Sequence, residues 1–236
     1  MKRFFSGFNK YDLYLWSVSV TCIAAAFFLY RNTDHLKLAV SIIGVTSLIF
    51  NAKGNPFGQL LMVVFSVIYG YISYSFRYYG EMITYIGMTL PMALFSLISW
   101  LRHPFQGAHS EVEVNRLSKK EYAFMGLLSI IVTVLFFFIL KALDTSSLIF
   151  STLSVLTSFT AAYLTFRRTK EYALAYALND IVLIILWSIA SGENKEYISL
   201  IICFIMFLAN DIYGYISWSI MEKRQKKIKN SNSEKI

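Results

Sequence analysis

The chain alternates long apolar runs with short polar connections. Eight runs are close to the roughly 20 residues that an α-helix needs to cross a hydrocarbon core about 30 Å thick, although the second is short. This pattern predicts an all-α integral membrane protein with about eight transmembrane helices. The approximate bounds of the runs are 11–30, 36–50, 57–76, 82–100, 122–140, 147–166, 172–190 and 196–220.

Composition agrees with a membrane protein. Of the 236 residues, 56% are hydrophobic and only 15% are charged, whereas soluble domains carry about 25% charged residues. We expect one transmembrane domain at 1–220 and a basic cytoplasmic tail at 221–236, disordered and attracted to anionic headgroups. The net charge of +8 lies between the apolar runs, so we interpret it as a topology signal and predict no nucleic-acid binding.

The placement of basic residues predicts the orientation of the chain. Eight spanning helices put 17 of the 22 Lys and Arg residues on one side of the membrane and 5 on the other. Cytoplasmic loops carry the excess of Lys and Arg in membrane proteins. We therefore predict that both termini are cytoplasmic.

Two Asn-Asp pairs, Asn179-Asp180 and Asn210-Asp211, lie well inside the last two runs. An Asp in mid-membrane costs about 2.5–3.5 kcal/mol on insertion scales. At about 1.5 Å of rise per residue, Asp180 and Asp211 lie roughly 12 and 13 Å from the same membrane face. Pro91 reaches that level on the fourth helix, where it should free a carbonyl and kink the helix. We predict a substrate site in this layer; the alternative is that these groups only hold helices together.

Aromatic rings accompany this layer. Tyr176 and Tyr213 lie deep, so we predict that either ring packs on a flat ligand while Asn179 hydrogen-bonds its polar edge. Rings near helix ends also serve as interfacial anchors, which is the alternative for Trp100, Trp218 and Tyr172. The candidate substrate-binding residues are Gln59, Trp100, Tyr172, Tyr176, Asn179, Asp180, Trp187, Asn210, Asp211, Tyr213 and Trp218.

The polar connections give no sign of a metal, a cofactor or a nucleotide. The segment 101–121 contains His103, His109, Glu111 and Glu113, but their spacing matches no metal-ligand motif, and we interpret the segment as a cytoplasmic linker. There is no disulfide framework and no phosphate-binding loop of an ATPase. These features favour a carrier that moves a solute down its gradient, with no cofactor.

A weak internal repeat divides the chain. Ile-Ser-Trp closes both the fourth and the eighth run, at 98–100 and 216–218, and a Gly-Glu turn precedes each of these runs. We predict one three-helix repeat at about 36–100, a linker helix at about 122–140 and a second repeat at about 147–220. The run 11–30 is then an extra N-terminal helix. Parallel repeats of this kind place a substrate site at their interface near the midplane.

Two segments carry a resemblance to a known family. Residues 77–93 followed by Ser99-Trp100, and the sequence Asn-Asp-Ile-Tyr-Gly at 210–214 leading to Trp218, resemble the PnuC family of vitamin transporters. The resemblance extends over almost the whole chain. The family commonly has Trp, Trp and Asn where this chain has Tyr172, Ala175 and Asn179.

The resemblance implies facilitated uptake of nicotinamide riboside through the bacterial plasma membrane, with trapping by a cytoplasmic kinase. It also implies a SWEET-like arrangement of three, one and three helices with an extra first helix, and a homo-oligomer, namely a trimer. Related carriers transport thiamine or riboflavin, so these vitamins remain alternatives. Two further alternatives are an intramembrane enzyme that uses Asp180 and Asp211 as an acid–base pair, and a structural or receptor subunit.

Overall fold

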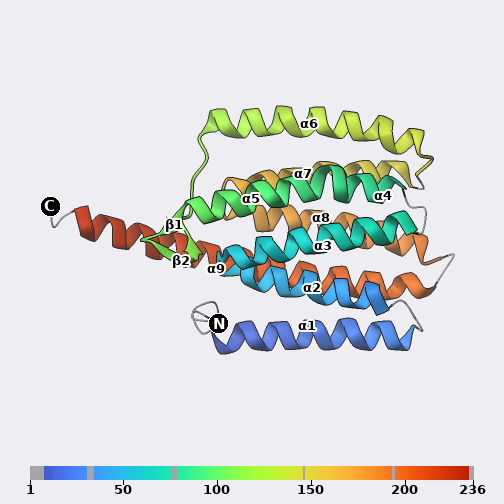
Figure 1. Cartoon of the computed structure of the whole chain (residues 1–236), viewed down its shortest axis with the longest axis horizontal. Helices are drawn as coiled ribbons and strands as arrows, with labels where there is room; N and C mark the ends of the chain where they lie inside the picture. The colour runs from blue at the N-terminus through green and yellow to red at the C-terminus, as the bar shows by residue number, and fades with distance from the viewer. Residues whose placement is uncertain (1–7, 31–34, 76–78, 146, 193–194, 234–236) are drawn as a thin grey trace.

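The computed structural model describes residues 8–30, 35–75, 79–145, 147–192 and 195–233. Within these ranges the protein is a bundle of long helices with one small β-hairpin at one end (Figure 1). Eight of the described helices are long and apolar enough to cross a membrane, which agrees with the predicted number. Five of the Lys and Arg residues counted for the membrane orientation lie outside the described residues: Lys2, Arg3, Arg31, Arg77 and Lys235.

The spanning elements follow the apolar runs closely, and the short second run is a full helix of 18 residues. The hairpin consists of β1 (Pro104–Phe105) and β2 (Ala108–Val112), which pair antiparallel. The helices are α1 (Lys10–Leu29), α2 (His35–Ala52), α3 (Pro56–Ser75), α4 (Tyr79–Ile83), α5 (Leu90–Arg102), α6 (Lys119–Ala142), α7 (Leu148–Phe166), α8 (Glu171–Ala190) and α9 (Ile198–Ser233).

Two helices begin with side chains that satisfy their free backbone N–H groups. At α1, Asn9 accepts from the backbone N–H of Asp12, and the Asp12 carboxylate accepts from the N–H of Asn9. Ser118 and Glu121 form the same reciprocal arrangement at the start of α6. This capping box fixes where a helix starts, so α6 begins at a defined point after the hairpin.

The fourth span is not uniform. A π-helical turn, Thr84–Thr89, joins α4 to α5, and Pro91 stands in the first turn of α5. The span is continuous here, since the Leu90 N–H donates to the Tyr85 carbonyl five residues earlier, and Pro91, which has no N–H, follows directly. The irregularity expected at Pro91 therefore takes the form of a widened turn that precedes the proline.

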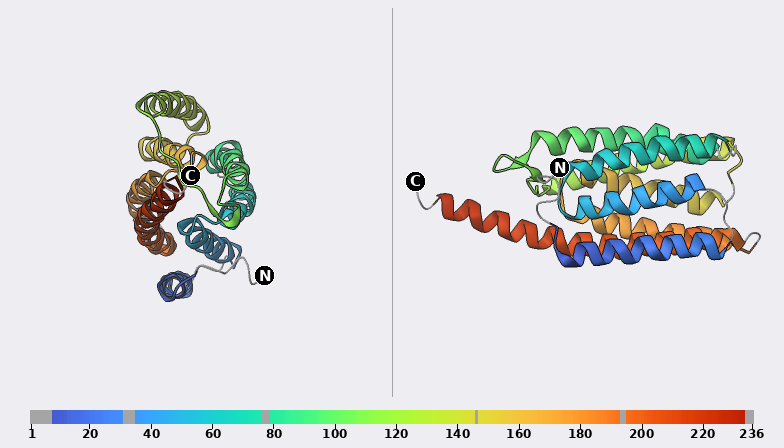
Figure 2. Two further views of the ribbon diagram at one scale, coloured as in Figure 1. Left: turned by 90° about the vertical axis from the view of Figure 1, so that its left-hand side faces the viewer. Right: turned by 60° about the horizontal axis from the view of Figure 1, so that its bottom comes forward.

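α2, α3, α5, α7, α8 and α9 surround the middle of the bundle, and α1 and α6 lie outside them (Figure 2). We divide these six helices in chain order into two groups. The first group is α2, α3 and α5; the second group is α7, α8 and α9. They meet where α2 packs on α9 and where α5 packs on α7. α1 packs on α2 and α9, while α6 packs on α7. The start of α1 and the end of α9 lie at the end of the bundle that carries β1 and β2 (Figure 1), which we call the hairpin end.

Two tryptophans join the groups at the hairpin end. The Trp100 indole N–H of α5 donates to the Thr165 carbonyl of α7 at 2.9 Å. In the reverse direction, the Trp218 indole N–H of α9 donates to the Asn51 carbonyl of α2 at 2.8 Å. Both side chains are fully buried, and their ring centroids lie 5.4 Å apart. Each group thus places a tryptophan against the last turn of the first helix in the other group.

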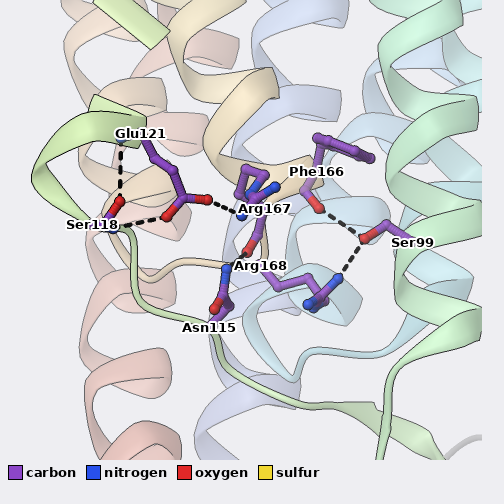
Figure 3. A network of polar contacts seen from close by, with 7 residues as sticks. All are labelled: Ser99, Asn115, Ser118, Glu121, Phe166, Arg167 and Arg168. Atoms are coloured by element: carbon purple, nitrogen blue, oxygen red, sulfur yellow. Dashed lines mark hydrogen bonds and ion pairs between the residues drawn. The ribbon is translucent and has the colours of Figure 1, made fainter. Parts of the chain in front are cut away.

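The segment after β2 ties the hairpin end together (Figure 3). Asn115 donates from its backbone N–H to the Arg168 carbonyl at 2.9 Å and from its side chain to the Arg167 carbonyl at 3.1 Å. The Arg168 guanidinium donates to the Ser99 hydroxyl at 2.7 Å, and this hydroxyl donates to the Phe166 carbonyl. Burial lowers the pKa of Arg168. The turn between α7 and α8 is therefore held by both the linker and α5.

The tail after Met221 is helical, not disordered as predicted. α9 runs without a break to Ser233 and leaves the bundle at the hairpin end (Figure 2). Gln225 explains the extension, because its side chain accepts from the Val114 N–H at 2.9 Å and donates to the Val112 carbonyl at 3.0 Å. Lys170 pairs with Glu222 at 2.9 Å, and this hydrogen bond raises the pKa of Lys170. The hairpin thus gives the basic segment partners that hydropathy alone did not reveal.

Candidate substrate-binding site

A cavity of about 190 Å³ lies between the two helix groups. Its walls come from α2, α3, the α4–α5 span, α7, α8 and α9, with Leu140 added from α6. No residue of α1, which is described throughout, lines it. The cavity therefore lies in the middle of the bundle, lined by both helix groups.

Two carboxyl groups share one wall of the cavity. Asp180 of α8 and Asp211 of α9 each line it, and each is only 4% exposed. Their side chains lie close enough to interact electrostatically. The structure therefore brings together the two aspartates that the sequence placed at the same depth.

Amide side chains flank this wall. Asn179 lines the cavity and accepts from the Thr157 hydroxyl at 2.8 Å through its side-chain oxygen. This contact orients the amide, and no hydrogen bond of its NH₂ group is seen among the described residues. The geometry fits a group that donates to the edge of a ligand.

A second amide pair comes from the first helix group. Gln59 lines the cavity and donates to the Asn51 side-chain oxygen at 2.9 Å. Gly58 makes room for this arrangement, because a Cβ there would lie 2.2 Å from the same Asn51 oxygen. The Asn51 amide in turn donates to the Ser47 hydroxyl. The side-chain carbonyl of Gln59 can therefore accept a hydrogen bond from a ligand.

Aromatic rings form much of the remaining surface. Tyr176 and Trp187 of α8 line the cavity, and so do Phe65 and Tyr69 of α3 and Tyr85 of the π-helical turn. Tyr69 and Tyr85 lie against each other with ring centroids 4.3 Å apart. A cavity that combines flat rings with amide and carboxyl groups suits a flat, polar ligand.

Five of the predicted residues do not line this cavity. Trp100 and Trp218 belong to the buried contact at the hairpin end, and Tyr172 packs on Trp218 with ring centroids 5.0 Å apart. Asn210 donates to the Ser19 hydroxyl of α1 at 2.9 Å. Tyr213 donates to the Asp12 carboxylate, also on α1. Asn210 and Tyr213 share one face of α9, three residues apart, and that face turns toward α1 while Asp211 turns inward.

One acidic residue of the cavity, Glu81, was not among the predicted site residues. Glu81 lines it from α4 and accepts from the Ser73 hydroxyl at 3.4 Å. The sequence suggested a polar turn here, but α4 already begins at Tyr79. An acidic residue at the edge of an apolar run was the available signal. The rings of Phe65 and Tyr85 gave no signal, because an apolar helix does not show which of its faces meets a cavity.

An eight-span helical bundle with a central cavity of polar and aromatic side chains is the architecture of a membrane transporter. The comparison with known families agrees: the model of the nicotinamide mononucleotide transporter family matches residues 34–220. The chain belongs to this family, and the resemblance to PnuC transporters is confirmed.

Relatives and one solved structure support this assignment. The chain is 25% identical over 227 residues to the nicotinamide riboside transporter PnuC of Neisseria mucosa, covering 94% of this chain and 86% of the relative. It is 24% identical to the protein of the same name from Haemophilus influenzae, covering 94% and 96%. The crystal structure of the vitamin B3 transporter PnuC matches with a TM-score of 0.80 and 24% identity, covering 95% of this chain and 97% of the other, which confirms the fold.

Proposed function

We propose that this transporter mediates facilitated uptake of nicotinamide riboside across the bacterial plasma membrane. The cavity carries the proposal: Asn179 offers an oriented amide beside the rings of Tyr176 and Trp187. A flat nicotinamide ring has a carboxamide that pairs with such an amide and a face that packs on the rings. The names of the two relatives support the same substrate.

The test is binding and flux with the purified full chain. Calorimetric titration with nicotinamide riboside, thiamine and riboflavin identifies the preferred vitamin, and uptake into liposomes shows transport. We expect nicotinamide riboside to bind most tightly and to cross unchanged. Preference for thiamine or riboflavin would reassign the substrate, and chemical conversion of the riboside would support an enzyme that uses Asp180 and Asp211.

We further propose that transport follows the substrate gradient and that a cytoplasmic kinase traps the product. Proteoliposomes should fill only until the internal and external concentrations are equal. Enclosing a riboside kinase with ATP should then extend uptake. Accumulation of unmodified riboside above the external level, with no ion gradient imposed, would contradict this proposal.

The proposed topology places both termini in the cytoplasm. It rests on the excess of Lys and Arg on the hairpin side and on the common end of the bundle at which α1 begins and α9 ends (Figure 1). A protease-cleavable tag after residue 236 should be protected in intact cells and cut after lysis. Cleavage from outside intact cells would reverse the orientation.

The repeat and the assembly are also proposals. The reciprocal contacts of Trp100 and Trp218 support one repeat at about 36–100 and another at about 147–220, joined by a linker helix at about 122–140. α6 lies at the periphery with exposed apolar side chains, among them Leu127, Ile131 and Phe138. The family resemblance supports a trimer, and light scattering of the detergent-solubilised protein measures the number of copies.

A further inference from the structure

Among the residues that the structure describes, no cation lines the cavity beside the buried carboxyl groups of Asp180 and Asp211. Both groups line the cavity and lie close enough to interact electrostatically. The Oδ2 atom of Asp180 is buried and has no hydrogen-bond partner among the described residues. No lysine, arginine or histidine is among the described residues that line the cavity. A buried charge normally has a partner of opposite sign, so this wall lacks a positive group.

The other inward-facing acids of the chain do have a nearby cation. Asp12 pairs with Lys53 at 2.8 Å. Glu222 pairs with Lys170 and Arg116. Glu81, the third acid of the cavity, lies close enough to Lys37 to interact with its charge. The aspartate pair is therefore distinguished by its surroundings and not by burial alone.

The rings around the pair favour the same sign of charge. Tyr176 belongs to the same helix as Asp180, one turn away, and lines the cavity together with Tyr85 and Trp187. The faces of aromatic rings carry negative electrostatic potential and attract cations. Carboxyl groups and ring faces thus both disfavour an anion and favour a positively charged, flat group.

We propose that Asp180 and Asp211 are the counter-charge for a cationic ring, and that they make the site select a charged substrate over a neutral one of the same shape. The inference rests on the proposed function, because nicotinamide riboside carries a permanent positive charge on its pyridinium nitrogen. It assigns a separate role to each group: Asn179 hydrogen-bonds the carboxamide, while the neighbouring carboxyl pair recognises the charge of the ring.

The decisive comparison uses two ligands that differ in ring charge. The reduced form, 1,4-dihydronicotinamide riboside, keeps the carboxamide and the ribose but has a neutral ring. We expect the wild-type protein to bind the oxidised form at least tenfold more tightly in calorimetric titration. Equal affinities for the two forms would overturn the inference even if every variant failed to fold.

Neutralising the pair should remove the discrimination. Asp180→Asn should weaken binding of the oxidised form by about tenfold to hundredfold, the size of a lost contact to a charged group. It should leave the reduced form within about threefold of wild type. Asp211→Asn should act in the same direction, and provides a second route if the first variant does not fold.

A matched variant separates charge recognition from general damage to the site. Asn179→Ala removes the amide and keeps both carboxyl groups, so it should weaken both ligands by similar factors. Asp180→Asn and Asp211→Asn could instead lower the affinity for both ligands equally, or change the affinity for neither. Either result would show that the pair does not recognise the ring charge, and the inference would be wrong. If the wild-type protein binds neither ligand, the proposed function itself fails, which is a different result.

Discussion

The two helix groups make matching tryptophan contacts but contribute different chemistry to the cavity. Each places a buried tryptophan against the last turn of the other group's first helix, at 2.9 and 2.8 Å. Seven residues before Trp218, α9 places Asp211 in the cavity; seven residues before Trp100, α5 places Ala93 there. The second group therefore carries the aspartate pair, while the first contributes Gln59, and Glu81 comes from α4.

Among the substitutions in the two helix groups, we expect the largest loss of ligand affinity from Asn179→Ala. Asn179→Ala removes a buried amide worth about 1–3 kcal/mol if a ligand group loses its partner, which is a tenfold to hundredfold loss of affinity at about 1.4 kcal/mol per decade. The dissociation constant and the melting temperature should be measured on the same preparation. Thr157→Val, which removes only the hydroxyl that orients Asn179, should cause a smaller loss. Unchanged affinity with lowered stability would make Asn179 a packing residue.

Substituting either tryptophan should lower stability by a similar amount, because both are buried at the hairpin end and make the same kind of hydrogen bond. Trp100→Phe and Trp218→Phe each remove an indole N–H from a buried carbonyl and leave a small void, at a cost of about 1–3 kcal/mol in the free energy of unfolding. Thermal or denaturant unfolding measures the loss. We expect ligand affinity to change by less than about threefold, since neither ring lines the cavity. A loss of binding without a loss of stability would place these rings in the site after all.

The smallest effect on binding should come from the first group. Gln59 uses one N–H of its amide on Asn51, so its second N–H and its carbonyl are left for a ligand. One neutral hydrogen bond contributes about 0.5–1.5 kcal/mol, and Gln59→Leu should therefore weaken binding roughly twofold to tenfold. Gln59→Glu is the control that keeps the shape. A loss larger than that of Asn179→Ala would reverse the proposed division between the groups.

Hydropathy predicted the spans well because each helix must be apolar over the full thickness of the bilayer. The same fact hides which face of a helix turns inward, since lipid and neighbouring helices accept the same residues. Asn210 and Tyr213 were assigned to the site for this reason, although they contact α1. The depth of Asp180 and Asp211 was predictable from helical rise alone, because depth does not depend on the face.

Other differences come from contacts between distant segments. Trp100 and Trp218 have the sequence position of interfacial anchors, yet their partners lie 65 and 167 residues away. The helical end of α9 depends on the hairpin, 113 residues upstream of Gln225. Local composition describes neither pairing, and only the folded bundle brings these groups together.

The contacts between α1 and α9 join the first and last spans of the chain, so they can form only late in synthesis. Ser19 and Asp12 of the first helix bond to Asn210 and Tyr213 of the last, across 191 and 201 residues of chain. At a synthesis rate of about 5–20 residues per second, these partners follow α1 out of the ribosome by roughly 10–40 s. The family match begins only at residue 34, after α1. α1 can pack on α2 as soon as α2 is made, whereas its bonds to α9 form only when the last span is complete.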